Sequence, residues 1–567
     1  MARKPKYKLA VIDAETDPFL HGRIPKPFAW EFHSDDVTEV FWGEDCTSDL
    51  ALFLASLKEP HMIFAHNGGK FDFHYLHEYL ANPIKIINSR IVSSAIDVDD
   101  RPPETRHVLR DSLAIIPVPL ARFFKGSKGD IDYRKMERQF RGEYKGEILD
   151  YLHQDCMSLL KVVSVFVERF GAKLTVGSTA MSQLSLRHDY EKMHQRQDAL
   201  FRPFYYGGRV QCFQHGIIKG PLIMLDVNSE YPTAMKKFSH PISATFHQVD
   251  YMPDSFDVPF FVEFTGSNDG ALPMKTENGS LSFEVEHGRF MACSHELQKA
   301  LEYGLVKIDR VHSAWIPAAH SSFANFVDEF YAEKVNAKKA GDELGEMFAK
   351  FMLNSAYGKF GSNPDNFRDW IINRDFGADI TLQANEYRLE AEFDDFELWS
   401  KPAANADNSF YNVATAASIT SAARSIMLDG IQKATDPIYC DTDSILCRGF
   451  TGEISSTELG AWKLEKTAPM AAVAGKKLYA LYDPVTLELP KTVQCDWNPK
   501  LKNPNPERKA LKLSSKGGQL TVDEIIEIAG GGRVTFKNDA PTFSLHNDPK
   551  FISRNFVSTV DEEPELI

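Results

Sequence analysis

The sequence has 567 residues, with 64 Lys and Arg against 79 Asp and Glu, which gives a formal net charge of −15. Its 43% hydrophobic and 25% charged residues are typical of folded globular proteins and exclude wholesale disorder, and its length predicts several domains. No apolar run is long enough for a transmembrane helix, and none follows the basic residues at the start, so we expect neither a membrane span nor a secretory signal.

The first part of the sequence mixes strand and helix patterns. Residues 7–13 and 61–65 are apolar runs typical of buried β-strands, and the first run ends at an acidic residue. The spacing of apolar residues over 145–170 predicts a long amphipathic helix. We therefore expect a domain with an α/β or α+β fold over residues 1–175.

The rest of the sequence also contains strand and helix patterns, so we expect the chain to be α+β multidomain. Asp342 is suited to cap the N-terminus of a helix. Residues 362–412 and 500–510 are rich in Asn, Asp and Pro and are predicted to be insertions or linkers. The predicted elements are a strand over 222–226, helices over 323–340, 342–357 and 413–433, and a hairpin over 437–446.

Charge is unevenly distributed along the chain. Residues 466–516 contain ten Lys and Arg against four Asp and Glu, although the protein as a whole is acidic. Such a stretch is either a solvated face or a track for nucleic acid, and the second interpretation predicts binding that weakens steeply with salt.

Five residues of the first part suggest a carboxylate site. Asp13 and Glu15 lie two residues apart at a strand end, so they point to one face, where they repel each other unless a cation lies between them. Asp72 follows a Gly-Gly turn, and Tyr151 and Asp155 share a helix face at i, i+4. Each feature alone is compatible with a structural role. Together they fit a two-metal phosphodiesterase site.

In this order the three segments resemble the Exo I, Exo II and Exo III motifs of the 3′–5′ proofreading exonuclease of family B DNA polymerases. The resemblance implies that Tyr151 orients the attacking water and that Lys128 stabilises the scissile phosphate. The residues that it assigns to metal ions are Asp13, Glu15, Asp72, Asp130 and Asp155. Those that it assigns to the single-stranded 3′ end are Thr16, His66, Asn67, Phe71, Ser112 and Leu113.

A second set of carboxylates lies further along the chain. Asp226 ends a predicted strand, and Asp441 and Asp443 lie at the tip of the predicted hairpin. Phosphoryl transfer needs in-line positioning and metal ions held by carboxylates more than covalent chemistry. Asp226 and Asp443 are therefore predicted to bind two metal ions, with the Val227 carbonyl as a further contact. The competing interpretation of Asp-Thr-Asp is a polar hairpin turn.

The cations for a triphosphate are predicted from the pair of helices. Lys350, Asn354 and Tyr357 follow one another at i, i+4 and i+7, so they share one helical face. That face offers an ammonium group, an amide and a ring. Lys338 on the preceding helix is expected to reach the same phosphates.

These segments resemble motifs A, B and C of family B DNA polymerases, and several motifs in the correct order make the resemblance specific. It implies that Tyr231 lies beneath the incoming sugar and excludes a 2′-hydroxyl, and that Tyr357 packs at the nascent base pair. Lys477 and Tyr479 match the Lys-x-Tyr motif that grips the primer strand. Tyr205, Gly207 and Gly208 match the Tyr-x-Gly-Gly element that contacts DNA and links the two activities.

Within that family, the sequence resembles the protein-primed polymerases of bacteriophages and linear plasmids, and is most similar to those of tailless, membrane-containing phages. The resemblance rests on the total length, on the short segment before the Exo I motif, and on the wording of motif B. The sequence departs from the usual wording at Glu230, where an apolar residue is common.

The resemblance implies a domain order. Residues 1–175 form the RNase H-like exonuclease, and 176–567 form a right-hand polymerase domain of palm, fingers and thumb. The implied parts are a palm over 176–240 and 413–480, an insertion over 240–320, fingers over 323–360, an insertion over 362–412, and a thumb over 500–567. We expect residues 362–412 to form a separate surface element that helps to enclose the downstream template.

The implied function is a DNA-directed DNA polymerase with 3′–5′ exonuclease activity, which replicates a linear genome by protein-primed initiation and strand displacement. Two Mg²⁺ or Mn²⁺ ions are expected per active site. The expected partners are primer–template DNA, dNTPs, a terminal protein and a single-stranded DNA-binding protein, with no membrane, and the chain is expected to be a monomer.

Seven cysteines without a Cys-x-x-Cys pair predict free thiols in a reducing compartment. The resemblance to phage and plasmid polymerases implies that this compartment is the cytoplasm of a bacterial host. Two alternatives remain open at this point. One is a nucleic-acid-primed repair polymerase of the same family. The other is a standalone 3′–5′ exonuclease whose C-terminal half is a DNA-binding clamp.

Overall fold

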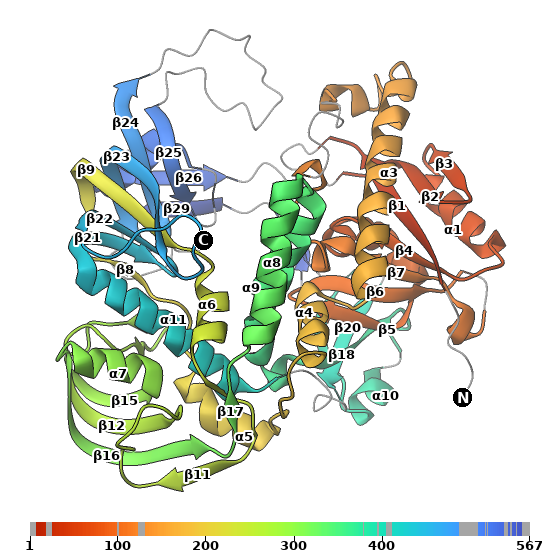
Figure 1. Cartoon of the computed structure of the whole chain (residues 1–567). Helices are drawn as coiled ribbons and strands as arrows, with labels where there is room; N and C mark the ends of the chain where they lie inside the picture. The colour runs from red at the N-terminus through yellow and green to blue at the C-terminus, as the bar shows by residue number, and fades with distance from the viewer. Residues whose placement is uncertain are drawn as a thin grey trace.

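The computed structural model places two large sheets on either side of a group of helices (Figure 1). The described residues are 7–18, 25–98, 101–122, 131–377, 379–393, 396–403, 411–486, 508–515, 518, 520–537, 542–544, 547–550 and 553–557. None of the described helices combines the length and apolar character that a membrane crossing requires.

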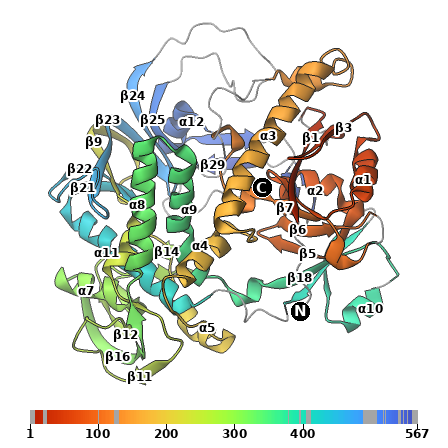
Figure 2. The same ribbon diagram turned by 45° about the vertical axis from the view of Figure 1, so that its right-hand side comes forward.

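Among the described residues, ten strands form the sheet that carries the Exo-like motifs, named the exonuclease sheet after them, in the order β19-β20-β18-β5-β6-β7-β4-β1-β2-β3. Helix α3 (Lys145–Phe170) packs across β1 and β2 (Figure 2). The strand bounds are β1 Lys8–Thr16, β2 Pro27–Ser34, β3 Thr38–Trp42, β4 His61–Ala65, β5 Leu80–Ile87, β6 Arg90–Ile96, β7 Val108–Asp111, β18 Arg368–Asn373, β19 Arg388–Glu392 and β20 Glu397–Pro402. The predicted strands at 7–13 and 61–65 and the predicted helix at 145–170 are confirmed.

The expectation that residues 362–412 stand apart as a surface element is wrong for their described part. Strand β18 pairs with β5 of the exonuclease sheet at Trp370 and Ile84. The Asn82 side chain donates to the Ile372 carbonyl at 2.7 Å and accepts from its N–H at 2.8 Å. The apolar side chains Trp370, Ile372 and Leu398 are buried in the exonuclease core, which outweighs the loop-like composition of the segment.

A second, antiparallel sheet carries the polymerase motifs. In the described part of the chain it has seven strands in the order β25-β24-β23-β9-β22-β21-β8. Their bounds are β8 Val210–Cys212, β9 Gly216–Val227, β21 Ala434–Asp441, β22 Ser444–Phe450, β23 Trp462–Gly475, β24 Leu478–Thr486 and β25 Arg508–Ser515. The predicted strand at 222–226 is the end of β9, and the predicted hairpin is β21–β22.

Helices α8 (Ala324–Ala340) and α9 (Glu343–Phe360) stand between the two sheets in both views (Figures 1 and 2). The predicted cap is confirmed, because the Asp342 side chain accepts from the Gly345 N–H at 2.9 Å. The predicted helix at 413–433 is α11 (Val413–Lys433), which is buried along most of its length. The shorter helices are α1 Cys46–Ser56, α2 Asp72–Tyr75, α4 Val176–Ser185, α5 Gln195–Phe201, α6 Glu230–Lys237, α7 Ser294–Glu302, α10 Asp379–Ala384 and α12 Val522–Ala529.

The segment between motifs A and B forms its own antiparallel layer, in the order β11-β16-β12-β15, with α7 packed on it. The bounds are β11 Phe246–Val249, β12 Phe261–Asn268, β15 His287–Cys293 and β16 Val306–Pro317. Two-stranded ribbons complete the described chain: β10 His240–Pro241 with β17 His320–Ser321, β13 Met274–Lys275 with β14 Leu281–Ser282, β26 Arg533–Lys537 with β29 Ser553–Val557, and β27 Thr542–Ser544 with β28 Asn547–Lys550.

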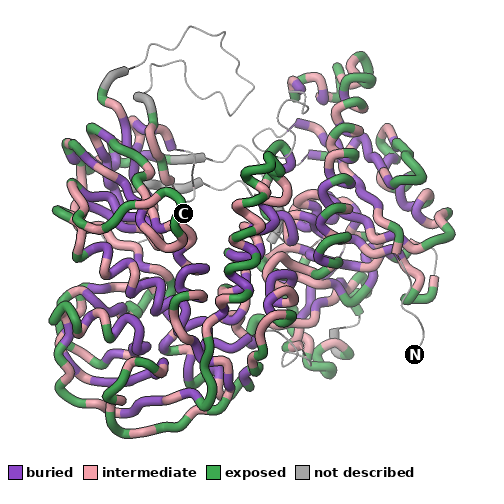
Figure 3. Tube along the Cα trace, in the orientation of Figure 1, coloured by how far each residue is buried: buried purple, intermediate pink, exposed green. Residues whose placement is uncertain are grey.

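The two halves share one hydrophobic core. Buried side chains of β1, α3, α9 and α11 belong to a single cluster, and the Phe166 ring of α3 meets the Phe348 ring of α9 edge to face at 5.2 Å. Figure 3 shows buried residues along the facing sides of these elements. The helices that carry the exonuclease and polymerase motifs are therefore packed against each other.

Candidate active sites

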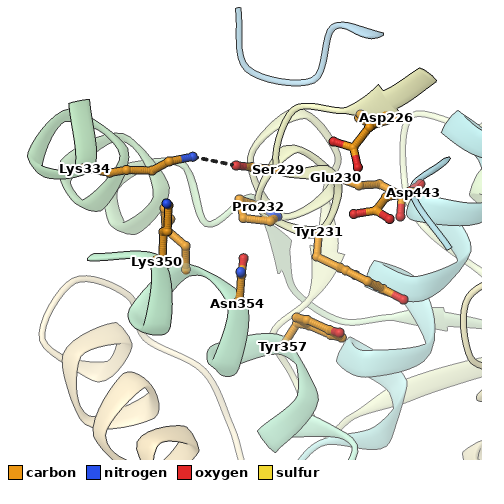
Figure 4. Close-up of a pocket in the computed structure, with 12 residues that line it drawn as sticks. Asp226, Ser229, Glu230, Tyr231, Pro232, Lys334, Lys350, Asn354, Tyr357 and Asp443 are labelled. Carbon is orange, nitrogen blue, oxygen red and sulfur yellow. Dashed lines mark hydrogen bonds between the residues drawn. The ribbon is translucent and has the colours of Figure 1, made fainter. Parts of the chain in front are cut away.

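A pocket of about 300 Å³ opens between the end of β9, the start of α6, and α9 (Figure 4). It gathers residues from all three polymerase-like motifs. Its lining residues are Asp226, Val227, Ser229, Glu230, Tyr231, Pro232, Lys334, Lys350, Leu353, Asn354, Tyr357 and Asp443.

Backbone pairing brings the two central carboxylates together. Strands β9 and β22 pair Asp226 with Ser444, and the Val227 N–H donates to the Asp443 carbonyl at 2.8 Å. Thr442 turns the hairpin with a φ of 59°, in the left-handed region. Burial, together with the charges of Asp226 and Asp441, raises the pKa of Asp443 to about 6. A site that crowds negative charge in this way fits a divalent cation with oxygen ligands.

Asp441 is held away from the pocket lining. Its carboxylate lies 3.1 Å from Lys477 Nζ and accepts from the Tyr439 hydroxyl at 3.2 Å. Asp226 in turn lies 2.9 Å from Lys463 Nζ. Lys463 is a residue that the sequence motifs did not predict. Asp441 therefore has a different environment from the two carboxylates that line the pocket.

Glu230 is buried beside these carboxylates, as Figure 4 shows. Neither of its side-chain oxygens has a hydrogen-bond partner among the described residues. Burial raises its pKa well above the usual range, and the charges of Asp443 and Asp226 act in the same direction. The glutamate that replaces the usual apolar residue of motif A thus adds a third acidic side chain to the pocket lining.

The opposite wall of the pocket is cationic. Lys350 forms an ion pair with Glu346 at 2.6 Å, and Lys334 donates to Ser229 Oγ at 3.3 Å. Burial and then the charge of Lys350 lower the pKa of Lys334. Lys338, which the sequence analysis selected, is exposed one turn further along α8 and does not line this pocket. The lysine of α8 that lines the pocket is Lys334, four residues before Lys338.

Two tyrosines form the floor of the pocket. The rings of Tyr231 and Tyr357 stack with centroids 3.9 Å apart. Asn354 lies one turn before Tyr357 on the same face of α9, as predicted. Gly208 lies against this floor, because a Cβ at that position would be 3.1 Å from the Tyr231 hydroxyl and 2.9 Å from a Thr442 methyl group.

A buried arginine fixes the Tyr-x-Gly-Gly segment. Arg424 of α11 donates to the carbonyls of Tyr206 and Gly207, each at 2.9 Å, and pairs with Glu296 of α7 at 2.6 Å. Tyr205 packs against Gly361 at the end of α9, where a Cβ would be 2.5 Å from its hydroxyl. The motifs gave no signal for Arg424 or Glu296, because their roles depend on contacts between distant helices.

The Lys-x-Tyr pair lies next to motif C. The Lys477 N–H donates to the Tyr439 hydroxyl at 3.0 Å, and the Tyr479 ring lies 4.8 Å from the Tyr439 ring. Tyr479 is only 3% exposed. The structure thus gives Tyr479 a supporting position, and its predicted contact with DNA stays a prediction.

The predicted exonuclease acids lie close together. Asp72, at the start of α2, is buried against β1, and the Ala14 backbone, between Asp13 and Glu15, gives it a hydrogen bond. Burial, together with the charge of Asp111, raises the pKa of Asp72 to about 7. Its Oδ1 has no hydrogen-bond partner among the described residues. An orphaned carboxylate oxygen in this setting fits a metal ligand.

Helix α3 brings Tyr151 and Asp155 to the same place. Burial raises the pKa of the Tyr151 phenol, and the neighbouring charges that add to the shift include Asp155, Glu15 and Asp13. The phenol therefore faces the acids of β1. Among the residues with sequence-based roles, Lys128 and Asp130 lie outside the described residues.

The predicted ligands of the 3′ end come from adjoining elements. Thr16 is buried at the end of β1, and the Phe71 ring lies 5.4 Å from the Tyr75 ring. His66 Nδ1 lies 2.9 Å from Ser112 Oγ, so the two short motifs meet. Leu113 follows Ser112 in the same 3₁₀ turn.

An ion pair that the motifs did not predict holds this region. Arg90 of β6 pairs with Asp111 and donates to Asn67 Oδ1 at 2.8 Å. Asp111 also accepts from the N–H groups of Gly69 and Leu113, at 3.1 and 2.9 Å. Arg90 and Asp111 thus fix the loop that carries Asn67.

A family model described as "DNA polymerase type B, organellar and viral" matches residues 128–443. The sequence is also 40% identical over 564 residues to the DNA-directed DNA polymerase of Enterobacteria phage PRD1. The alignment covers 98% of this chain and 99% of the relative. This chain belongs to the type B DNA polymerases. A more distant relative, the DNA polymerase of Bacillus phage Nf, is 26% identical over 486 residues, or 79% of this chain and 78% of its own.

The fold of this type B polymerase is similar to that of solved phage enzymes. The phi29 DNA polymerase superposes with a TM-score of 0.71 and 17% identity, covering 98% of this chain and 100% of its own. A ternary complex of the same enzyme with primer–template DNA and incoming nucleotides gives a TM-score of 0.69. The similarity shows that the two proteins share a fold over nearly the whole of both chains.

Proposed function

We propose that this type B polymerase copies DNA in the pocket of Figure 4 and removes mispaired 3′ ends at the cluster around Asp72. The observation that carries the proposal is the pocket itself. Its carboxylates lie on one wall and its lysines on the other, which is the arrangement that a nucleoside triphosphate and divalent ions require.

Different residues of the pocket have different roles in nucleotide addition. Asp226, Asp443 and the Val227 carbonyl would hold two Mg²⁺ or Mn²⁺ ions, which supply charge neutralisation for the phosphates and a more acidic primer hydroxyl when bound. Lys334 and Lys350 bind the triphosphate, and Tyr231 packs under the sugar.

At the second site, Asp13, Glu15, Asp72 and Asp155 would hold two further ions. The Tyr151 phenol, which stays protonated at neutral pH because burial and the nearby acids raise its pKa, donates a hydrogen bond that orients the attacking water. The reaction class is hydrolysis of the 3′-terminal phosphodiester. The loop with His66 and Asn67 holds the single-stranded end.

Initiation on a protein hydroxyl is the finer part of the proposal. It is supported by the resemblance to protein-primed polymerases and by near full-length similarity to a phage enzyme. The primer is then a terminal protein, and elongation displaces the other strand, with a single-stranded DNA-binding protein as helper. The enzyme works as a monomer in the cytoplasm of a bacterial host.

The test is incubation of the chain with the candidate terminal protein, a template and labelled dNTP. We expect a labelled protein–nucleotide adduct that Asp443→Ala abolishes. Extension of a primed oligonucleotide without any adduct would favour a nucleic-acid-primed repair polymerase. Loss of label from a 3′-labelled primer without any extension would favour a standalone exonuclease.

A further inference from the structure

A cluster of two histidines and one glutamate lies between β2 and α3, outside both sets of motif residues. Glu31 Oε1 is 2.7 Å from His153 Nδ1 and 3.7 Å from His33 Nδ1. The two imidazole rings meet edge to face at 5.2 Å. Among the described residues, these three form the group of potential ligands whose donor atoms all lie within 4.8 Å of one another.

The contact with His153 leaves one oxygen of the Glu31 carboxylate without a hydrogen-bond partner among the described residues. The Glu31 side chain is 0% exposed, and its Oε2 has no hydrogen-bond partner among the described residues. His153 and His33 remain partly accessible, at 41% and 15%. A simple ion pair between Glu31 and His153 would leave Oε2 buried without a partner, at an appreciable cost in free energy.

The geometry fits a small transition-metal ion. Ligands at about 2.0–2.2 Å around a tetrahedral ion lie roughly 3.3 Å apart, a spacing that the observed 2.7 and 3.7 Å bracket. His33 Nδ1 also lies 2.7 Å from Thr38 Oγ1, so metal binding exchanges one hydrogen bond for a coordinate bond. Two imidazoles and a carboxylate favour Zn²⁺ over Mg²⁺.

We propose that Glu31, His33 and His153 bind one divalent transition-metal ion, such as Zn²⁺, that joins β2 to α3. Glu31 is the register partner of Asp13 across β1 and β2, and His153 lies two residues before Asp155 on α3. The ion therefore fixes the helix that carries Asp155 to the sheet that carries Asp13. That positioning effect rests on the proposed exonuclease, whereas the metal binding does not.

The test is a titration of the metal-free full-length chain with Zn²⁺ in excess Mg²⁺, which occupies the carboxylate sites. We expect one equivalent of Zn²⁺ to bind wild type and to bind His33→Gln at least about tenfold more weakly. The matched control is His287→Gln, which alters an exposed histidine 3.0 Å from Asp309 with no third ligand in the described chain, and which should bind as wild type.

A second readout keeps the inference testable if one variant fails to fold. Zn²⁺ should raise the unfolding temperature of wild type and of His287→Gln, but not of His33→Gln or His153→Gln. Equal Zn²⁺ affinity in wild type and both cluster variants would overturn the site. If Zn²⁺ binds normally but the exonuclease rate does not respond to Zn²⁺, the proposed metal site would stand and its proposed role in positioning Asp155 would be wrong.

Discussion

The ring of Tyr231 lies flat on the ring of Tyr357, with centroids 3.9 Å apart and planes inclined by 6°. The contact joins the start of α6 to the last turns of α9. The floor of the pocket is therefore fixed by two elements, and its shape depends on the rings more than on their hydroxyl groups.

This stacking predicts how the sugar is selected. Tyr231→Val should raise the use of ribonucleotides relative to deoxyribonucleotides by about tenfold or more, because a 2′-hydroxyl then meets open space. Tyr231→Phe should select as wild type does. Single-nucleotide incorporation with matched rNTP and dNTP measures the ratio, and an unchanged ratio in Tyr231→Val would assign the ring to core packing alone.

The buried ion pair under the Tyr-x-Gly-Gly segment predicts a stability effect. Arg424→Met should lower the free energy of unfolding by about 3–5 kcal/mol, because Glu296 is then left buried without its partner. The double variant Arg424→Met with Glu296→Leu should recover part of that loss. Denaturant unfolding of the three proteins checks this, and a fully stable single variant would contradict it.

Acid should destabilise the protein through two buried histidines. Burial lowers the pKa of His240 to about 3 and that of His295 to about 4, against about 6.5 in an unfolded chain. The unfolded state therefore binds more protons, and the stability present above about pH 6.5 is lost as the pH falls toward these values.

The measurement is the unfolding free energy from pH 7 to pH 4.5. His295→Gln keeps a donor for the Ser239 carbonyl, which lies 3.0 Å from His295 Nε2, but removes the titrating group. Its stability should fall less steeply, by about 1.4 kcal/mol per pH unit for one proton. An identical pH dependence in both proteins would show that His295 is not involved.

The strand that joins the second insertion to the exonuclease sheet predicts an uneven effect on the two activities. Trp370→Ala should destabilise the exonuclease side by about 3–5 kcal/mol, since the ring is buried in that core. Degradation of a 3′ end should then lose activity at a lower temperature than nucleotide addition does. Parallel heat inactivation of the two activities would contradict this.

Local patterns in the sequence were sufficient to predict many of the helices and strands and most of the carboxylates that lie at the two candidate sites. The apolar run that ends at Asp13, the helix that carries Tyr151, and the cap at Asp342 are all set by neighbouring residues, and the structure places each as expected. These features depend on local periodicity and hydrogen bonding, which a single sequence displays.

The remaining features depend on contacts between distant segments. Arg424 reaches Tyr206 and Glu296 from another helix. Lys334, not Lys338, lines the pocket, and spacing within α8 does not distinguish these two lysines, because residues four apart share one helix face. The sequence gives no sign that Trp370 and Ile372 are buried in the first sheet, because β5, the strand that β18 joins there, lies almost 300 positions away along the chain.

The most direct test of two separate active sites is a pair of time courses, one of degradation on a primer with a mismatched 3′ end and one of nucleotide addition on a matched primer. Asp13→Ala with Glu15→Ala should lose 3′–5′ degradation by about a hundredfold or more and keep addition to a matched primer, because only one set of metal ligands is removed. Asp443→Ala should do the reverse. If the first variant lost nucleotide addition as completely as Asp443→Ala does, the two-site account would be wrong.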